Sequence, residues 1–316
     1  MRVKIGPNEA GQRVDKFIRK WLKELPLSAI YRAIRKGDIK VNGKKVRDAY
    51  FLVEGDLVET KYLDVEKKEE KFERRDNKLK VTYEDENMLI VEKWPGVLVH
   101  KDKKEEVSLT DYVLSYLFDK GEYYPNKDIA FKPSPCNRLD RNTSGVVIYA
   151  KNFESLKLLN EMIRNRDIKK YYTALVKGRI KDGLYEAYIS KDNKNNVSKV
   201  KKEESEDSKK IAMDIKTIES CGLFSLVDIE LITGRSHQIR AHFKELGHEI
   251  VGDTKYGDKK TNNFFINKYG LNYQYLYAYK LQFRNCKDKL DYMENKTLAE
   301  SLPPIFKKIK TDVFKF

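Results

Sequence analysis

The chain contains little cysteine, and its cysteines lie far apart. Cys136, Cys221 and Cys286 are the only cysteines among the 316 residues, and no two of them form a CxxC pair. Three distant cysteines supply neither a disulfide framework nor the paired thiolates of a zinc site. This usage is typical of a reducing compartment, so we predict a cytoplasmic protein.

Long apolar runs and an excess of acidic residues are also lacking. No stretch approaches the roughly 18 apolar residues of a membrane span, and Met1 precedes Arg2-Val3-Lys4 rather than an apolar signal segment. Lys and Arg number 64 against 49 Asp and Glu, for a formal net charge of +15. We therefore expect a soluble, untargeted protein with no membrane partner. The charge favours nucleic acid as a partner, although a lysine-rich surface can also arise without one.

Several common catalytic motifs are missing. The absence of GxSxG, GxxxxGK[ST] and GxGxxG argues against the usual hydrolase, NTPase and dinucleotide-binding classes. Pro135-Cys136 resembles part of a zinc-deaminase motif, but the second cysteine and the HxE element are absent. His237 and His242 are five residues apart, yet His242 shares an apolar helical stripe with Phe243, which favours packing over metal ligation. We expect no metal site.

Two helices and a hairpin are predicted within the first sixty residues. Apolar residues recur at helical spacing over Val14–Leu22, Pro26 then interrupts the chain, and Ser28 can cap a second helix. Gly37 stands where a left-handed C-cap is expected, and Asn42-Gly43 is a typical hairpin turn. The pattern predicts a small α/β unit.

The exposed positions of these helices are predicted to be mainly basic. Packed side by side, the helices would present one basic face suited to phosphates, or merely a solvated surface. The run RVDKFIRKWL…LSAIYRAIRKGDIKVNGKKV resembles an S4 domain, a compact RNA-binding module. That resemblance implies RNA contacts from this face, which comprises Arg13, Lys16, Arg19, Lys20, Arg32, Arg35 and Lys36.

A charged linker and a larger domain are predicted beyond the S4-like unit. We place the first domain at residues 1–63, the linker at 64–78 and the larger domain at 79–316. Strands alternate with short helices in the larger domain, without a repeat, so we predict an α+β fold with a mixed, mainly antiparallel sheet flanked by helices. The expected strands are Leu79–Tyr83, Met88–Glu92, Gly145–Ala150, Tyr172–Lys177 and Leu226–Ile232, the expected helices are Ser108–Phe118 and Phe153–Arg164, and Lys191–Lys210 is expected to be a loop or an extended hairpin.

Two polar segments are candidates for chemistry. In the first, Asp140 lies among arginines in a polar, Gly-terminated loop that runs into an apolar strand. Catalytic groups often lie on such loops, although a turn-capping Asp with a surface ion pair would show the same pattern. In the second, Gly234–Arg240, two arginines flank a helix start near Gln238. They could bind a phosphate, supply a cation to a distant carboxylate, or simply face water.

These segments carry a family resemblance. RLDRNTSG resembles the HRLDRxTSG signature of the RluA family of pseudouridine synthases, and GRSHQIRAHFKELGHEIVGDTKYG resembles that family's second long signature. KKYYTA, LIVEKWPGVLVH and LYAYKLQF resemble further family segments, so the likeness spans nearly the whole chain. With the S4-like unit in front, the nearest branch is RluC-like, whose members modify uridines in large-subunit ribosomal RNA. The chain departs from the pattern at Asn137 and Tyr277, where the family has His, and at Pro95, which is displaced by one residue.

The resemblance implies a mechanism without cofactor or metal. Asp140 would attack C1′ of the uridine or take its 2′ proton, Arg240 would pair with Asp140 and orient it, and Tyr172 would contact the uracil. Arg138 would fill the space left by the flipped base. The other residues that we assign to substrate binding are Arg141, Thr143, Arg235, His237, Gln238 and Ile239.

We thus expect a monomeric enzyme that isomerises uridine to pseudouridine in RNA, with 23S ribosomal RNA or a pre-50S particle as its partner. One alternative is a synthase that modifies tRNA, because phosphate contacts carry little sequence information. Another is a non-catalytic RNA-binding assembly factor. Such a factor would tolerate the loss of Asp140, so the intact set of Asp140, Tyr172 and Arg240 argues against it.

Overall fold

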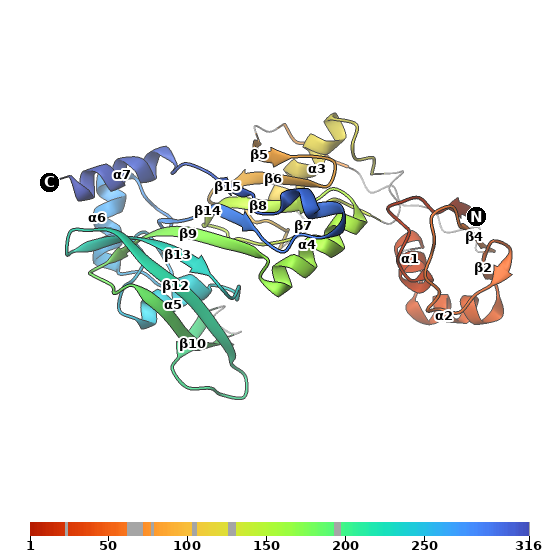
Figure 1. Cartoon of the computed structure of the whole chain (residues 1–316), viewed down its shortest axis with the longest axis horizontal. Coiled ribbons are helices and arrows are strands. Elements are labelled where there is room, and N and C mark those ends of the chain that lie inside the picture. The colour runs from red at the N-terminus through yellow and green to blue at the C-terminus, as the bar shows by residue number, and fades with distance from the viewer. Residues whose placement is uncertain are drawn as a thin grey trace.

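The computed structural model describes residues 1–22, 25–61, 72–76, 79–102, 106–125, 131–192 and 197–315. They form two sheets of very different size. A four-stranded sheet with two helices makes the N-terminal domain, and an 11-stranded sheet with the remaining helices makes the larger domain, as Figure 1 shows.

The N-terminal domain contains the two predicted helices and the predicted hairpin. Its helices are α1 (Val14–Trp21) and α2 (Leu27–Lys36), and its sheet has the order β1 (Arg2–Lys4), β4 (Leu57–Thr60), β2 (Ile39–Val41), β3 (Lys44–Lys45). The apolar faces of both helices and the inner strand positions share one core.

Local turn chemistry in this domain agrees with the sequence at three positions and differs at one. Gly37 ends α2 with φ 78°, and Asn42 and Gly43 have φ 50° and 73° at the hairpin turn. Ser28 is not the cap of α2, which corrects our prediction. The helix begins two residues earlier than a cap at Ser28 implies, because Pro26 takes the N-cap position and its carbonyl accepts hydrogen bonds from the N–H groups of Ala29 and Ile30.

The larger domain contains the following elements. Its strands are β5 (Lys80–Glu84), β6 (Met88–Lys93), β7 (Ser134–Pro135), β8 (Ser144–Ala150), β9 (Ile168–Lys177), β10 (Gly183–Asp192), β11 (Val197–Lys201), β12 (Lys209–Ser220), β13 (Phe224–Leu231), β14 (Leu276–Phe283) and β15 (Thr297–Ala299). Its helices are α3 (Leu109–Asp119), α4 (Phe153–Asn165), α5 (Gln238–Glu245), α6 (Lys259–Tyr269), the 3₁₀ helix η1 (Asp288–Met293) and α7 (Pro304–Phe314). Within the described ranges, no helix has the length and apolar character needed to cross a membrane.

The predicted mixed, mainly antiparallel sheet is confirmed. Its strand order is β11-β10-β12-β13-β9-β14-β8-β6-β5, with β15 beside β14 and β7 beside β8. The pair β14 and β8 is parallel, with Tyr277 opposite Ser144 and Ala278 opposite Gly145, whereas the other recorded pairs are antiparallel. The parallel pair lies near the middle of the sheet, so the loop before β8 opens at the centre of the domain.

Helices cover both faces of the sheet. Leu89 and Val91 of β6 pack in the cluster that contains α3 and α5, whereas Met88 and Ile90 of the same strand pack in the cluster that contains α4 and η1. Helices α6 and α7 add a further cluster around Tyr275. Every residue of β8 is buried, as expected for a central strand covered on both faces.

Most of the predicted elements of the larger domain are present within a few residues of the expected bounds. The segment Lys191–Lys210 forms the tip of an extended hairpin between β10 and β11 and leads into β12, and residues 193–196 lie outside the described part. Most of the predicted linker, residues 64–71 and 77–78, also lies outside it. Phe72 packs against the core of the larger domain, and Ser115 Oγ accepts a hydrogen bond from the Arg75 N–H group, so residues 72–76 associate with that domain.

The two domains touch at the start of α4. The Lys20 ammonium lies 5.5 Å from the ring centroid of Phe153, and Asn8 Oδ1 accepts a hydrogen bond of 3.4 Å from the Phe153 N–H group. The N-terminal domain thus lies beside the helix that follows β8.

Candidate active site

Asp140 lies on the loop between β7 and β8. The Thr143 N–H group donates to the Asp140 carbonyl at 3.1 Å, which closes a turn immediately before β8. Gly145 then has φ 125°, and a Cβ at this position would lie 2.2 Å from the carbonyl oxygen of Ala278 on β14. Only glycine allows this approach, so the Gly that ends the motif permits the parallel pairing that carries the loop.

The Asp140 loop is held from the other side by a buried lysine. Lys93 is fully buried, and its ammonium donates to the carbonyls of Trp94, Val97 and Arg141 at 3.1, 2.9 and 2.8 Å. Burial lowers the pKa of Lys93, whereas three carbonyl acceptors match the three donors of the charged form and favour it. The Gly96 N–H group also donates to the Arg141 carbonyl, at 3.0 Å. The residue after Asp140 is therefore fixed by two donors.

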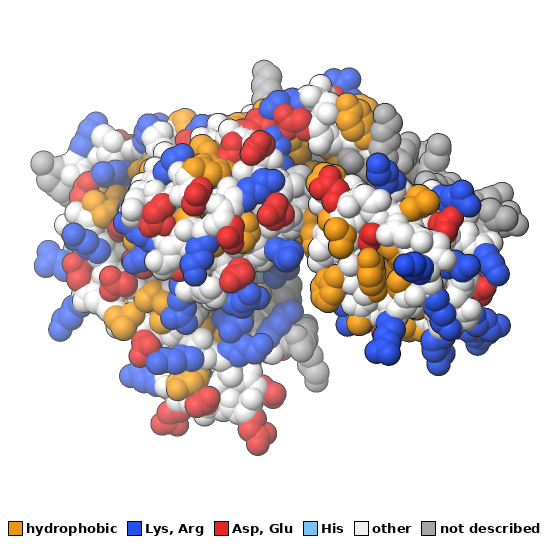
Figure 2. Space-filling model, turned by 45° about the vertical axis from the view of Figure 1, so that its right-hand side comes forward, with side chains coloured by type: hydrophobic (Ala, Val, Ile, Leu, Met, Phe, Trp, Pro, Cys, Tyr) orange, Lys and Arg blue, Asp and Glu red, His pale blue; other side chains and the backbone are white. Residues whose placement is uncertain are grey.

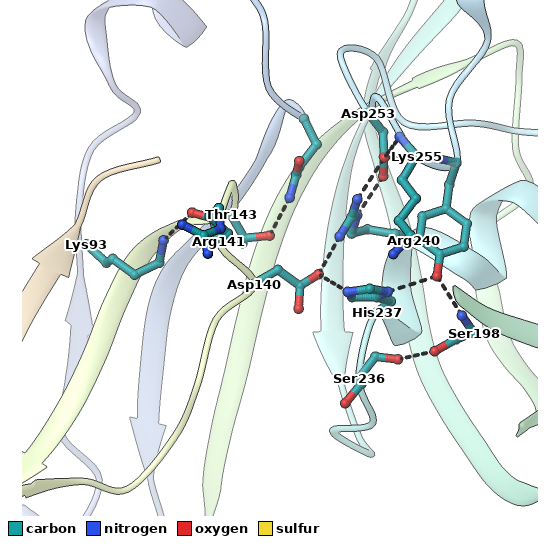
Figure 3. Close-up of polar contacts among 12 residues, drawn as sticks. Lys93, Asp140, Arg141, Thr143, Ser198, Ser236, His237, Arg240, Asp253 and Lys255 are labelled. Atoms are coloured by element: carbon teal, nitrogen blue, oxygen red, sulfur yellow. Dashed lines mark hydrogen bonds and ion pairs between the residues drawn. The ribbon is translucent and has the colours of Figure 1, made fainter. Parts of the chain in front are cut away.

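Arg240 of α5 connects Asp140 to a second carboxylate. Its Nη1 donates to Asp140 Oδ2 at 2.8 Å, while Nε and Nη2 donate to the two carboxylate oxygens of Asp253 at 2.7 and 2.9 Å. Asp253 is fully buried and also accepts from the N–H groups of Lys255 and Tyr256. Burial alone would raise the pKa of Asp253, but its hydrogen bonds and ion pair with Arg240 outweigh burial and lower it. The two hydrogen bonds to Asp253 therefore orient the Arg240 guanidinium toward Asp140, as Figure 3 shows.

His237 approaches Asp140 from the start of α5. Its Nε2 lies 4.0 Å from Asp140 Oδ2, and its Nδ1 lies 2.9 Å from the hydroxyl of Tyr256. Desolvation lowers the pKa of His237. The positive charges of Arg240 and Lys255 lower it further, whereas the negative charge of Asp140 raises it. His237 also has φ 55°, a left-handed conformation that is uncommon for a non-glycine residue and recurs at functional sites.

Tyr172 of β9 and several basic residues complete a cavity of about 1050 Å³ around Asp140. Tyr172 is buried, and desolvation together with the negative charge of Asp140 raises its pKa, so the phenol keeps its proton at neutral pH. Basic side chains outnumber acidic ones in the lining, which includes Arg138, Arg164, Arg166, Lys170 and Arg235. The cavity can thus receive a polar ring beside a carboxylate and anionic groups at its mouth.

The structure brings the predicted trio of Asp140, Tyr172 and Arg240 together in this cavity, although 100 residues separate Asp140 from Arg240. The remaining predicted substrate-binding residues also line it, but their side chains differ in availability. Arg138 and Arg235 are exposed at the cavity, whereas Arg141 forms an ion pair with Glu106.

The side chains of Thr143, Gln238 and Ile239 have structural contacts. Thr143 Oγ1 accepts from Gln274, and Ile239 packs in the central core. The Gln238 amide bonds to Thr233 Oγ1, the Arg235 N–H group and the Ala212 carbonyl, which shapes the turn before α5. These contacts position the cavity wall, and substrate binding by the three residues stays a prediction.

Asn137 and Tyr277, which stand where the family has His, each form hydrogen bonds within the protein. Asn137 Oδ1 accepts from the Ile148 N–H group at 2.8 Å, which ties the start of the loop to β8. Tyr277 is fully buried and donates to Glu92 at 2.8 Å. His242 packs in the interior with Tyr185 edge-on to its ring, which confirms the packing prediction, and burial lowers its pKa to about 4.

Among the described residues 1–22 and 25–61, the basic side chains are exposed with the exception of Arg13. Arg13 is half-buried, and its guanidinium donates to both carboxylate oxygens of Asp15 at 3.0 and 2.9 Å, so its RNA contact stays a prediction. Figure 2 shows Lys and Arg side chains along the lower rim of this domain. The exposed members of the predicted face are Lys16, Arg19, Lys20, Arg32, Arg35 and Lys36.

Sequence reasoning missed three residues that organise the site: Lys93, Asp253 and Tyr256. All three lie in segments that resemble family signatures, LIVEKWPGVLVH and GDTKYG. A lysine within an apolar strand and an acidic residue thirteen positions after Arg240 were the available signals. Neither signal identifies a partner, because the partners lie on other elements.

Comparisons with known proteins show the family of this chain. Residues 87–245 match the RNA pseudouridylate synthase family, and residues 12–58 match the S4 domain. The fold and the cavity therefore define an RNA-modifying enzyme with an accessory S4 domain. The chain belongs to the RNA pseudouridylate synthase family and is an RNA pseudouridine synthase.

Similar proteins cover nearly the whole chain. The chain is 32% identical to the ribosomal large subunit pseudouridine synthase C of Vibrio parahaemolyticus, over 95% of this chain and 93% of that protein. It is 33% identical to the protein of the same name from Escherichia coli, over 89% and 88%, and 34% identical to an uncharacterized RNA pseudouridine synthase of Mycoplasma capricolum, over 94% and 96%. A solved structure, human RNA pseudouridylate synthase domain containing 4, shares the fold with a TM-score of 0.58 at 22% identity, over 74% of this chain and 92% of that one.

Proposed function

We propose that this enzyme isomerises uridine to pseudouridine in large-subunit ribosomal RNA, with Asp140 as its catalytic carboxylate. The observation that carries the assignment of Asp140 is its place in the cavity. Its Oδ2 is held by Arg240 at 2.8 Å, and Tyr172 and several basic side chains line the same space. Asp140 and Asp102 are the carboxylates that line this cavity within the described residues, and of the two only Asp140 is paired with the buried Arg240.

The reaction breaks the C1′–N1 bond, turns the detached uracil and joins C5 to C1′. Asp140 supplies the carboxylate beside the ribose, either to attack C1′ or to take the 2′ proton. Arg240 orients that carboxylate from a fixed guanidinium, because Asp253 holds its other edge. Tyr172 contacts the uracil and, as a protonated phenol, serves as a hydrogen-bond donor near C5 and its carbonyl groups.

RNA binding and base flipping involve the basic residues. Arg138 is exposed at the cavity and two residues before Asp140, a position from which it fills the space left by the flipped uridine. We assign residues 1–63 to an S4 RNA-binding domain, joined through 64–78 to the catalytic domain at 79–316. The exposed basic residues of α1 and α2 bind phosphates and raise affinity without touching the uridine.

Ribosomal RNA is the favoured substrate because the relatives named above from Vibrio parahaemolyticus and Escherichia coli are ribosomal large subunit pseudouridine synthases. The similarity to the Vibrio parahaemolyticus protein extends over 95% of this chain, so it includes most of the N-terminal domain. A pseudouridine map of ribosomal and transfer RNA from cells with and without the gene tests this assignment. Sites lost from the large-subunit RNA would support it, and sites lost from tRNA alone would overturn it.

The role of Asp140 is tested by Asp140→Asn, which keeps the size of the side chain and removes its charge. We expect pseudouridine formation to fall by more than about a thousandfold in single-turnover assays, while RNA affinity and thermal unfolding stay near wild type. Asp102→Asn is the matched control, because Asp102 also lines the cavity but has no contact with Arg240 among those recorded for the described residues. Activity of Asp140→Asn within tenfold of wild type would refute the assignment.

A further inference from the structure

Strand β11 is joined to the Asp140 site by hydrogen bonds from its free edge. β11 is the last strand of the large sheet, and the Ser198 N–H group on it donates to the Tyr256 hydroxyl at 2.7 Å. Ser198 Oγ donates to the carbonyl of Ser236 at 2.9 Å, one residue before His237. Figure 3 shows His237 between Ser198 and Asp140, and the Tyr256 hydroxyl contacts both Ser198 and His237.

Donor and acceptor chemistry fixes the direction of the hydrogen bond from Ser198, and the tautomer of His237 decides the direction of the next one. A backbone N–H group can only donate, so the Tyr256 oxygen accepts from Ser198. The Tyr256 hydroxyl keeps one proton to donate, and His237 Nδ1, at 2.9 Å, accepts it when the imidazole carries its own proton on Nε2. An imidazole whose Nδ1 accepts a hydrogen bond carries its proton on Nε2, and Nε2 is the atom that faces Asp140 Oδ2 at 4.0 Å.

We propose that Tyr256 fixes His237 in the Nε2–H tautomer and that this N–H group positions the Asp140 carboxylate, so that the placement of β11 is transmitted to the reacting group. The inference rests on the proposed function, in which Asp140 reacts with the uridine. His237 and Tyr256 are positioning residues that act through Asp140. A shift of about 1 Å would bring Nε2 within hydrogen-bonding distance of Oδ2, which already holds the Arg240 bond.

The surrounding charges support a neutral His237. The charged groups that face its ring are Asp140 before β8, Arg240 on α5, and Asp253 and Lys255 on the loop after α5. Burial and the two cations outweigh the two carboxylates and lower the pKa of His237, so the ring is neutral at pH 7. Burial raises the pKa of Tyr256, which therefore keeps the proton that it donates.

Tyr256 has a second contact that the test must separate from this one. Its ring lies 5.0 Å from the guanidinium carbon of Arg240. Tyr256→Phe retains that ring and removes only the hydroxyl. His237→Gln places an amide near the position of Nε2, so it retains a donor toward Asp140 that does not depend on Tyr256.

The tautomer is tested directly by ¹⁵N NMR of the full-length protein labelled in histidine, without RNA. The His237 signals are identified by their loss in His237→Gln. We expect the wild-type ring to show a protonated Nε2 and an unprotonated Nδ1 at pH 7, and Tyr256→Phe to shift it toward a mixture of tautomers. A proton on Nδ1 in the wild type, or a spectrum unchanged by Tyr256→Phe, would overturn the inference. This readout does not depend on pseudouridine formation.

The effect on Asp140 is tested by a double-mutant cycle on the single-turnover rate at saturating RNA. Tyr256→Phe should slow the wild type roughly tenfold, as expected for loss of a hydrogen bond to a charged group, with RNA affinity nearly unchanged. In the His237→Gln background the same change should slow the reaction less than about twofold. Equal losses in both backgrounds would show that Tyr256 acts only through packing and would overturn the inference.

A matched control is Tyr275→Phe, which also removes a buried hydroxyl, but one that donates to the Phe306 carbonyl on α7. This variant should react at the wild-type rate, and a tenfold loss here would overturn the inference by showing that any buried hydroxyl has the same effect. If the wild-type protein itself forms no pseudouridine, the proposed function fails, and the NMR experiment still decides the tautomer.

Discussion

Replacing Arg240 by Lys tests whether the geometry of the guanidinium, and not merely its charge, serves Asp140. Arg240 makes three hydrogen bonds to two carboxylates, and the single ammonium of a lysine cannot reach both in the same way. The Asp253 side chain is 0% exposed, whereas that of Asp140 is 25% exposed. Because a desolvated carboxylate gains more from a cation, we expect the lysine to pair with Asp253 and to leave Asp140 without its donor.

The loss can be estimated from that missing bond. A hydrogen bond between charged groups contributes about 1.5–3 kcal/mol, which corresponds to roughly a 10- to 150-fold lower rate at saturating RNA. RNA affinity should change less than threefold, because Arg240 is buried and its guanidinium contacts protein carboxylates. Single-turnover rates, equilibrium RNA binding and thermal unfolding measure the three quantities separately.

Arg179→Lys is the control for this substitution, since Arg179 is exposed and does not line the cavity. It should match the wild type in all three assays. If Arg240→Lys lost RNA affinity while keeping the wild-type rate, Arg240 would be a phosphate contact and the reasoning would be refuted.

Three further outcomes are expected. Lys93→Met should lower the free energy of unfolding by about 2–4 kcal/mol, because the Arg141 carbonyl loses a donor. The variant should also slow turnover more than it weakens RNA binding. Wild-type stability in denaturant would contradict this prediction. His242 takes up a proton near pH 6.5 when unfolded but only near 4 when folded, so its contribution to stability is present above pH 6.5 and is lost as the pH falls toward 4. The wild type should therefore lose up to about 3 kcal/mol more than His242→Leu over that window, and parallel unfolding curves would refute it. The double variant Arg19→Ala, Arg35→Ala should weaken RNA binding and retain turnover at saturating RNA. The slope of the logarithm of the binding constant against the logarithm of the salt concentration should become less steep by about 0.7–0.9 for each lost phosphate contact. An unchanged slope would show that this face does not bind RNA.

Local features of the fold could be predicted because short-range chemistry determines them. Helical spacing of apolar residues located α1, α3 and α4, and the turn residues Gly37 and Asn42-Gly43 adopt the expected left-handed conformations. The same reasoning misplaced the start of α2, where Pro26 and Ser28 compete for the cap. Local preference favours Ser at the N-cap and Pro at the first helical position, so it did not predict a cap at Pro26.

The sequence alone also determined which residues were candidates for the site and in which segments they lie. Asp140 stood out in a polar loop that precedes an apolar strand, and Arg240 stood out in a polar segment between an apolar strand and a helix start. The motif RLDRNTSG ends in Gly145, whose contact with Ala278 explains why that position requires glycine. A motif records such a requirement, but it does not name the partner.

Only the tertiary structure decided which partners meet. Asp140 and Arg240 are 100 residues apart. They meet because the sheet order β8, β14, β9, β13 places β8, which follows Asp140, near β13, which leads into the helix that carries Arg240. The three-way pairing of Arg240 and the line from Ser198 through Tyr256 to His237 likewise join separate elements. Strand order and register set these distances, and they depend on the burial of whole sheet faces. No local pattern in the chain determines strand order or register, so the roles of Lys93, Asp253 and Tyr256 became recognisable only in the folded protein.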